Sequence, residues 1–154
     1  MSENILPHTP SAHALVGVSL CEAGRTIDDW SRALFLAALL SGLWIASPPP
    51  NFFALAAGVV FAGFEAWHAL RLAFDRPIFA AWARCDDDAL PEVLRGFDAV
   101  LAPQQGTAGD GTLRPLSARV AGVRRLLLCQ AVCLGGQAAS LVFVWSEYFL
   151  RAHA

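Results

Sequence analysis

The stretch from Trp30 to Phe74, WSRALFLAALLSGLWIASPPPNFFALAAGVVFAGFEAWHALRLAF, contains two apolar runs separated by three consecutive prolines. The first run, residues 29–47, would form roughly 28 Å of helix, close to the hydrocarbon thickness of a bilayer. Proline lacks an N–H and clashes with the preceding turn, so the chain must turn at Pro48–Pro50. The second run covers residues 51–74. Because so short a linker makes two helices antiparallel neighbours, the stretch predicts a membrane hairpin.

A soluble helical hairpin is the alternative, because each strictly apolar core has only about 13–14 residues. Two features favour the membrane. Both runs are apolar on all sides, and a chain of 154 residues leaves little protein to bury them. A third uncharged run extends from Leu126 to Ser146, and the chain is 56% hydrophobic and only 16% charged. We therefore predict one all-α integral membrane domain, residues 1–154, with three transmembrane helices.

The basic residues indicate an orientation. All 11 of them are arginines, and all except Arg151 lie on one side of the three-span arrangement. Arg25 and Arg32 lie near the start of the first run, and the others lie from the end of the second run to the start of the third. By the positive-inside rule that side is cytoplasmic. We expect a multi-pass protein of the bacterial inner membrane, with a cytoplasmic N-terminus, a periplasmic C-terminus and no removable signal peptide. The net charge of −2 gives nucleic-acid binding no electrostatic support.

The segments outside the spans are also predicted to be helical. Residues 1–28 either lie along the inner membrane surface or extend the first span, and Asp75 with Pro77 predicts the end of the second helix. Residues 76–115 form a cytoplasmic segment and loop, and residues 116–150 form one long helix containing the third span. Arginine and aromatic side chains favour membrane interfaces, and the expected anchors are Arg76, Phe79, Trp82, Arg84, Arg124, Arg125, Trp145 and Tyr148.

The cytoplasmic segment contains an amphipathic pattern. Its apolar residues recur at the spacing of one helical face and are Leu90, Val93, Leu94, Phe97, Val100 and Leu101. This stripe must be buried against the helix bundle, the lipid surface or another protein. We expect it to bind a cytoplasmic partner.

Polar residues within the apolar runs are the candidate functional site. Glu65 and His68 are three residues apart, the spacing used by di-metal sites in helical bundles, but such sites need two copies and this chain has one. No metal is therefore predicted. The pair either sets helix depth and packing or carries a function such as a proton relay or haem ligation. Gln130 and Gln137 are spaced two turns apart and either join helices by hydrogen bonds or line a polar pathway.

Small residues on the third run suit close helix packing. Cys129, Cys133, Gly136 and Ser140 share one face, and the four cysteines of the chain form no disulfide or zinc pattern. The third span is therefore expected to pack on the hairpin through this face.

These features predict a small non-catalytic membrane subunit that anchors, stabilises or scaffolds a larger complex or a homo-oligomer. Its expected partners are membrane lipid and other membrane subunits or further copies of itself, with no nucleic acid and no cofactor. Two alternatives remain open. One is a redox anchor that binds haem or quinone through His68 and Glu65, and the other is a proton- or ion-conducting oligomer that uses Glu65.

Overall fold

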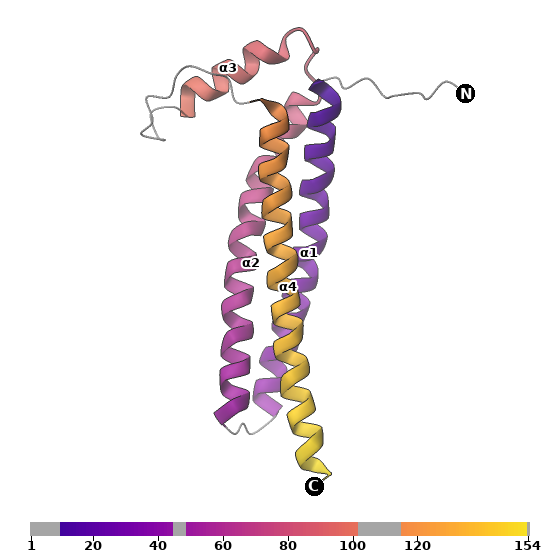
Figure 1. The fold of residues 1–154 in the computed structure, drawn as a ribbon, viewed down its shortest axis with the longest axis vertical. Coiled ribbons are helices and arrows are strands. Elements are labelled where there is room, and N and C mark those ends of the chain that lie inside the picture. The colour runs from indigo at the N-terminus through magenta and orange to yellow at the C-terminus, as the bar shows by residue number, and fades with distance from the viewer. Residues whose placement is uncertain (1–9, 45–48, 102–114, 154) are drawn as a thin grey trace, which may run out of the picture.

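The computed structural model describes residues 10–44, 49–101 and 115–153, and this part of the chain is helical without strands. Its helices are α1 (Pro10–Trp44), α2 (Pro49–Trp82), α3 (Leu90–Leu101) and α4 (Leu116–Ala152) (Figure 1). The prediction of an all-α chain is confirmed.

Three long helices lie side by side, and the short helix α3 lies across one end of them (Figure 1). α2 is antiparallel to α1, and α4 runs in the same direction as α1, so the C-terminal end of α4 lies at the end of the bundle where α1 ends and α2 begins (Figure 1). α2 begins at Pro49, where a missing N–H does no harm because the first helical N–H groups have no partner in the helix. The antiparallel pairing of the two helices, which the hairpin prediction required, is confirmed.

Two predicted helix boundaries can now be decided. α1 is continuous from Pro10 to Trp44, so the N-terminal segment extends the first apolar run. The predicted break at Asp75 and Pro77 is wrong, because α2 continues through both residues to Trp82. A proline inside a helix costs about 3 kcal/mol. Burial of Phe79 and Trp82 beyond it contributes about 1.5–3 kcal/mol for each large apolar side chain, which offsets that cost.

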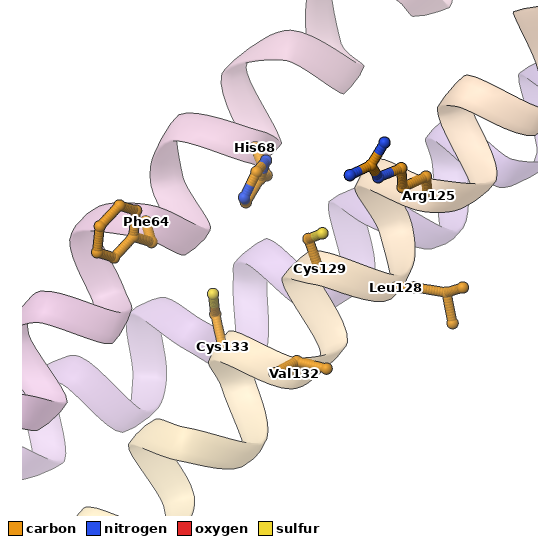
Figure 2. A pocket seen from close by; sticks show the side chains of 7 residues that line it. All are labelled: Phe64, His68, Arg125, Leu128, Cys129, Val132 and Cys133. Carbon is orange, nitrogen blue, oxygen red and sulfur yellow. The ribbon is translucent and has the colours of Figure 1, made fainter.

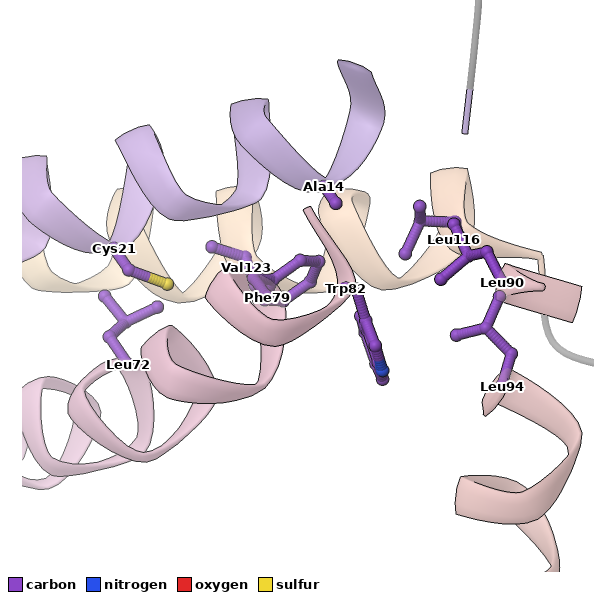
Figure 3. Close-up of a cluster of buried hydrophobic side chains, with 9 residues drawn as sticks. All are labelled: Ala14, Cys21, Leu72, Phe79, Trp82, Leu90, Leu94, Leu116 and Val123. Atoms are coloured by element: carbon purple, nitrogen blue, oxygen red, sulfur yellow. The ribbon is translucent and has the colours of Figure 1, made fainter. Parts of the chain in front are cut away.

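The hydrophobic core lies at the α3 end of the bundle and draws on all four helices (Figure 3). Phe79 and Trp82 meet edge to face with ring centroids 5.2 Å apart. The buried members of the core are Ala14, Cys21, Leu72, Phe79, Trp82, Leu90, Leu94, Leu116 and Val123. The structure thus places Phe79 and Trp82 inside the protein, where their rings contact other helices, and not at the membrane interface expected from the sequence.

The apolar stripe of α3 is divided between this core and solvent. Leu90 and Leu94 are buried against the other helices, and Phe97 is partly buried with its ring 5.3 Å from that of Trp82. Val93 and Val100 remain exposed, and the side chain of Leu101 lies outside the described residues. The expected partner-binding face is therefore largely taken up by the chain's own core.

An arginine of α4 holds α3 in place. The Arg119 guanidinium lies over the rings of Trp82 and Phe97, 5.3 and 5.6 Å from their centroids, and forms an ion pair with Asp98. Cation–π contacts of this kind contribute about 0.5–2 kcal/mol each. Arg119 thus joins α4 to both α2 and α3.

Two helices in the described part are long and apolar enough to cross a membrane, namely α2 over Asn51–Trp82 and α4 over Leu116–Ala152. α1 does not qualify over its described residues, and residues 45–47 of the predicted first span lie outside them.

Candidate functional site

A layer of buried polar side chains joins the three long helices near their middle. The Gln130 side-chain amide on α4 donates a hydrogen bond of 2.8 Å to the Glu65 carboxyl group on α2. The same amide lies 3.5 Å from the backbone carbonyl oxygen of Gly24 on α1. Glu65 is 1% exposed and Gln130 is completely buried. The structure therefore brings two of the predicted polar residues into direct contact.

Ser31 on α1 extends this polar layer along the bundle by two helical turns. Gln137, two turns after Gln130, donates a 2.7 Å hydrogen bond from its amide to the Ser31 hydroxyl. The Ser31 side chain also interacts with the Glu65 carboxyl group. Gln137, Ser31, Glu65 and Gln130 thus belong to one buried polar layer, with members on α1, α2 and α4.

Glycine makes room for the polar layer. A Cβ atom at Gly24 would lie 2.6 Å from Leu72 Cδ1 and 2.9 Å from the Gln130 amide oxygen. Any larger residue there would push Gln130 away from Glu65. On α4, a Cβ atom at Gly136 would lie 2.8 Å from the Phe61 ring, and Ser140 faces Gly58. The small-residue face of α4 thus packs on the hairpin.

Two further buried polar residues lie toward the end of the bundle where α1 ends and α2 begins. The Ser41 hydroxyl accepts a 3.1 Å hydrogen bond from the Trp145 indole N–H and donates one of 2.7 Å to the Ala37 carbonyl oxygen. Asn51 is 1% exposed, and its side-chain oxygen has no hydrogen-bond partner in the described part of the chain. The sequence reasoning missed Ser31 and Asn51 as site residues. Gly24 and Ser31 have the same spacing as Gln130 and Gln137, a match that becomes informative once α1 and α4 are known to be parallel neighbours.

The polar layer is not fully satisfied. The side-chain oxygens of Gln130 and Gln137 are buried and accept no hydrogen bond from a described residue. Each such atom costs about 1–3 kcal/mol. Among the described residues no group of three or more His, Cys, Asp or Glu side chains is placed to hold a metal ion. The contacts that the structure gives this layer are hydrogen bonds between helices.

His68 is separated from Glu65 and borders a groove between α2 and α4 (Figure 2). Its Nδ1 atom is buried and has no hydrogen-bond partner in the described structure. The groove has a volume of about 330 Å³ and is lined by Phe64, His68, Arg125, Leu128, Cys129, Val132 and Cys133. The predicted Glu65–His68 pair does not form a single site.

The remaining predicted anchors lie at both ends of the bundle. Arg76 forms an ion pair with Glu22, while Arg84, Arg124 and Arg125 are exposed near the α3 end. At the other end the rings of Trp145 and Tyr148 meet edge to face, with their centroids 5.9 Å apart.

Comparison with known proteins adds no family: no protein-family description, characterised protein or solved structure matches this chain. Arguments about its function therefore rest on the geometry of its own residues.

Proposed function

We propose that the chain is a small, non-catalytic subunit of the bacterial inner membrane, with α1, α2 and α4 crossing the bilayer and assembling with other subunits or further copies. The observation that carries this proposal is an inverted distribution of side chains. Large apolar side chains are exposed, among them Leu43 at 85%, Phe74 at 71% and Val132 at 70%, while Glu65 and Gln130 are sealed inside. Exposed apolar surface of this extent favours lipid as the surrounding medium.

The dimensions support a transmembrane arrangement. The uncharged part of α4, Leu126 to Ser146, is about 31 Å long, which matches the hydrocarbon core. Of the arginines only Arg151 belongs to the end where the C-terminus lies. Under the positive-inside rule the α3 end is then cytoplasmic, with the C-terminus in the periplasm.

A charged face of α1 supports the assembly part of the proposal. Hydrogen bonds hold Gly24 level with Gln130 and Ser31 level with Gln137. Residues 25–32 of α1 are therefore level with the uncharged part of α4, and Arg25, Asp29 and Arg32 are exposed there.

Charges at this depth are expensive in lipid. A charged residue at the centre of a transmembrane helix costs about 2.5–3.5 kcal/mol. Within the described residues Arg32 pairs with Asp28, whereas Arg25 and Asp29 form no ion pair. Coverage of this face by another protein subunit would remove the cost, because opposite charges there can be paired across an interface.

Fractionation and purification test the two parts separately. We expect the tagged protein to stay in the membrane pellet after alkaline carbonate washing and to leave a mild detergent column with stoichiometric partners or as an oligomer. Recovery in the soluble fraction would overturn the membrane part.

The double variant Arg25→Leu/Asp29→Leu tests the assembly part. It should remain in the membrane but lose its partners or dissociate, while the control Arg84→Leu, outside this face, should assemble normally. An unassembled wild-type protein, or a double variant that assembles like the wild type, would contradict the role of this face.

A further inference from the structure

The groove between α2 and α4 has a polar end and an apolar end (Figure 2). Arg125 and His68 lie at one end, and Phe64, Val132 and Cys133 lie toward the other. Its volume of about 330 Å³ falls in the range of ligand-binding sites. This division suits a ligand with a polar head and an apolar tail.

The polar end suits an anion. The described residues that line the groove include a guanidinium and an imidazole but no carboxylate. The five N–H donors of arginine match phosphate oxygens in pairs. The buried, unpartnered Nδ1 atom of His68 lies beside the groove, and after rotation of the ring an oxygen atom of a bound ligand would supply its missing partner.

The position of the groove along the bundle favours a lipid. Arg124 and Arg125 are the last charged residues before the uncharged part of α4, so in the proposed orientation they lie at the level of the inner headgroups. From there the apolar end extends toward the middle of the bilayer, in the direction of an acyl chain.

We propose that this groove binds one anionic phospholipid, with its phosphate held by Arg125 and His68 and an acyl chain lying along Phe64 and Val132. The site goes beyond the role of a subunit and rests on the proposed membrane location.

Two thiols allow binding of a ligand in the groove to be measured. Cys129 lies in the groove and is half-buried, whereas Cys85 lies outside it. Purified full-length protein in detergent is treated with N-ethylmaleimide, and mass spectrometry follows the alkylation of each cysteine. The additives are dioleoylphosphatidylglycerol, dioleoylphosphatidylcholine and oleate in separate samples.

We expect phosphatidylglycerol to slow the alkylation of Cys129 and leave Cys85 unchanged, and phosphatidylcholine to have little effect. Arg125→Gln should raise the phosphatidylglycerol concentration for half-protection about tenfold, as for loss of a charge-assisted hydrogen bond. The matched control is Arg124→Gln. Arg124 directly precedes Arg125 and is exposed, but it does not line the groove, so this variant should behave as the wild type.

Three outcomes would overturn the proposal. Equal protection by phosphatidylcholine and phosphatidylglycerol would show a groove without headgroup selectivity. Equal losses in Arg124→Gln and Arg125→Gln would show a general charge effect, and protection by oleate alone would replace the phospholipid with a fatty acid. Each of these results concerns protein extracted from the membrane, so the membrane proposal would stand. Fractionation as a soluble protein would instead remove both.

Discussion

The Gln130 amide donates a 2.8 Å hydrogen bond to the Glu65 carboxyl group, and the two side chains are enclosed where α1, α2 and α4 meet. Glu65 thus acts as the acceptor that fixes the register of α2 against α4. A side-chain hydrogen bond inside a bundle is specific because it forms at only one relative height of the two helices.

Replacement of Glu65 should separate the effect of this hydrogen bond from the effect of charge. Glu65→Ala leaves the Gln130 amide with only the Gly24 carbonyl 3.5 Å away, so it should lose about 1–3 kcal/mol of stability. Glu65→Gln keeps an acceptor oxygen and should lose clearly less. Thermal unfolding in detergent, followed by circular dichroism, measures both changes. If Glu65→Gln were as unstable as Glu65→Ala, the carboxyl group itself would be required.

Adjacent glycines of α4 provide a test of the packing. A Cβ atom at Gly136 would lie 2.8 Å from the Phe61 ring, whereas one at Gly135 would meet nothing within 4 Å. Alanine has the same advantage in helix propensity over glycine at both positions. The difference in stability between the two variants therefore reports the clash with Phe61. We expect Gly136→Ala to be less stable than Gly135→Ala by about 1–3 kcal/mol. Equal unfolding temperatures would mean that α2 and α4 are farther apart than described.

Loss of Arg119 should loosen α3. Arg119→Ala removes the contacts with Trp82, Phe97 and Asp98, together worth about 1–2 kcal/mol. Because protease cleavage follows the population of the open form, trypsin should then cut after Arg95 on α3 about tenfold faster.

Arg124→Ala is the control for this change, because Arg124 is exposed on the same helix. Its cleavage rate after Arg95 should equal that of the wild type. Unchanged cleavage in Arg119→Ala would mean that Leu90 and Leu94 alone hold α3.

Stability should fall at alkaline pH because of Cys21. Burial, with a smaller contribution from Asp75, raises the pKa of the Cys21 thiol from its ordinary value of 9.0 to about 11. Below pH 9 the thiol is protonated in both states. Between about pH 9 and 11 the unfolded chain loses this proton while the folded chain keeps it, so unfolding becomes more favourable, by about 2–3 kcal/mol at most.

Chemical unfolding across this pH range measures the loss. Cys21→Ala, which lacks the titrating group, should show a shallower decline in the free energy of unfolding than the wild type. Parallel declines in the two proteins would assign the effect to other groups.

The hairpin could be predicted from the sequence because its determinants are local: three prolines between two apolar runs. The continuation of α2 through Pro77 could not, because the cost of proline is local whereas the compensating burial of Phe79 and Trp82 depends on the other helices. The same limit applies to the stripe of α3, whose periodicity revealed an apolar face but not what covers it.

The candidate site was predictable only in part. Of the two alternatives for Gln130 and Gln137, the structure shows hydrogen bonds to other helices, with Glu65 and Ser31 as acceptors. Their partners depend on the relative heights and rotations of three helices, which composition and spacing do not contain. Glu65 and His68 were grouped by their three-residue spacing, but a helix turns about 300° over three residues, which leaves the two side chains about 60° apart. That difference directs Glu65 into the bundle and His68 to the groove.

The long helices contain 35, 34 and 37 residues, so each is about 50–55 Å long. A hydrocarbon layer of about 30 Å would enclose little more than half of that length. In the proposed orientation most of the remainder extends into the cytoplasm as a rigid continuation of the bundle, with α3 packed at its end (Figure 1). Each long helix is continuous across the expected membrane surface. A tilt of the bundle within the bilayer would therefore move α3 sideways relative to that surface.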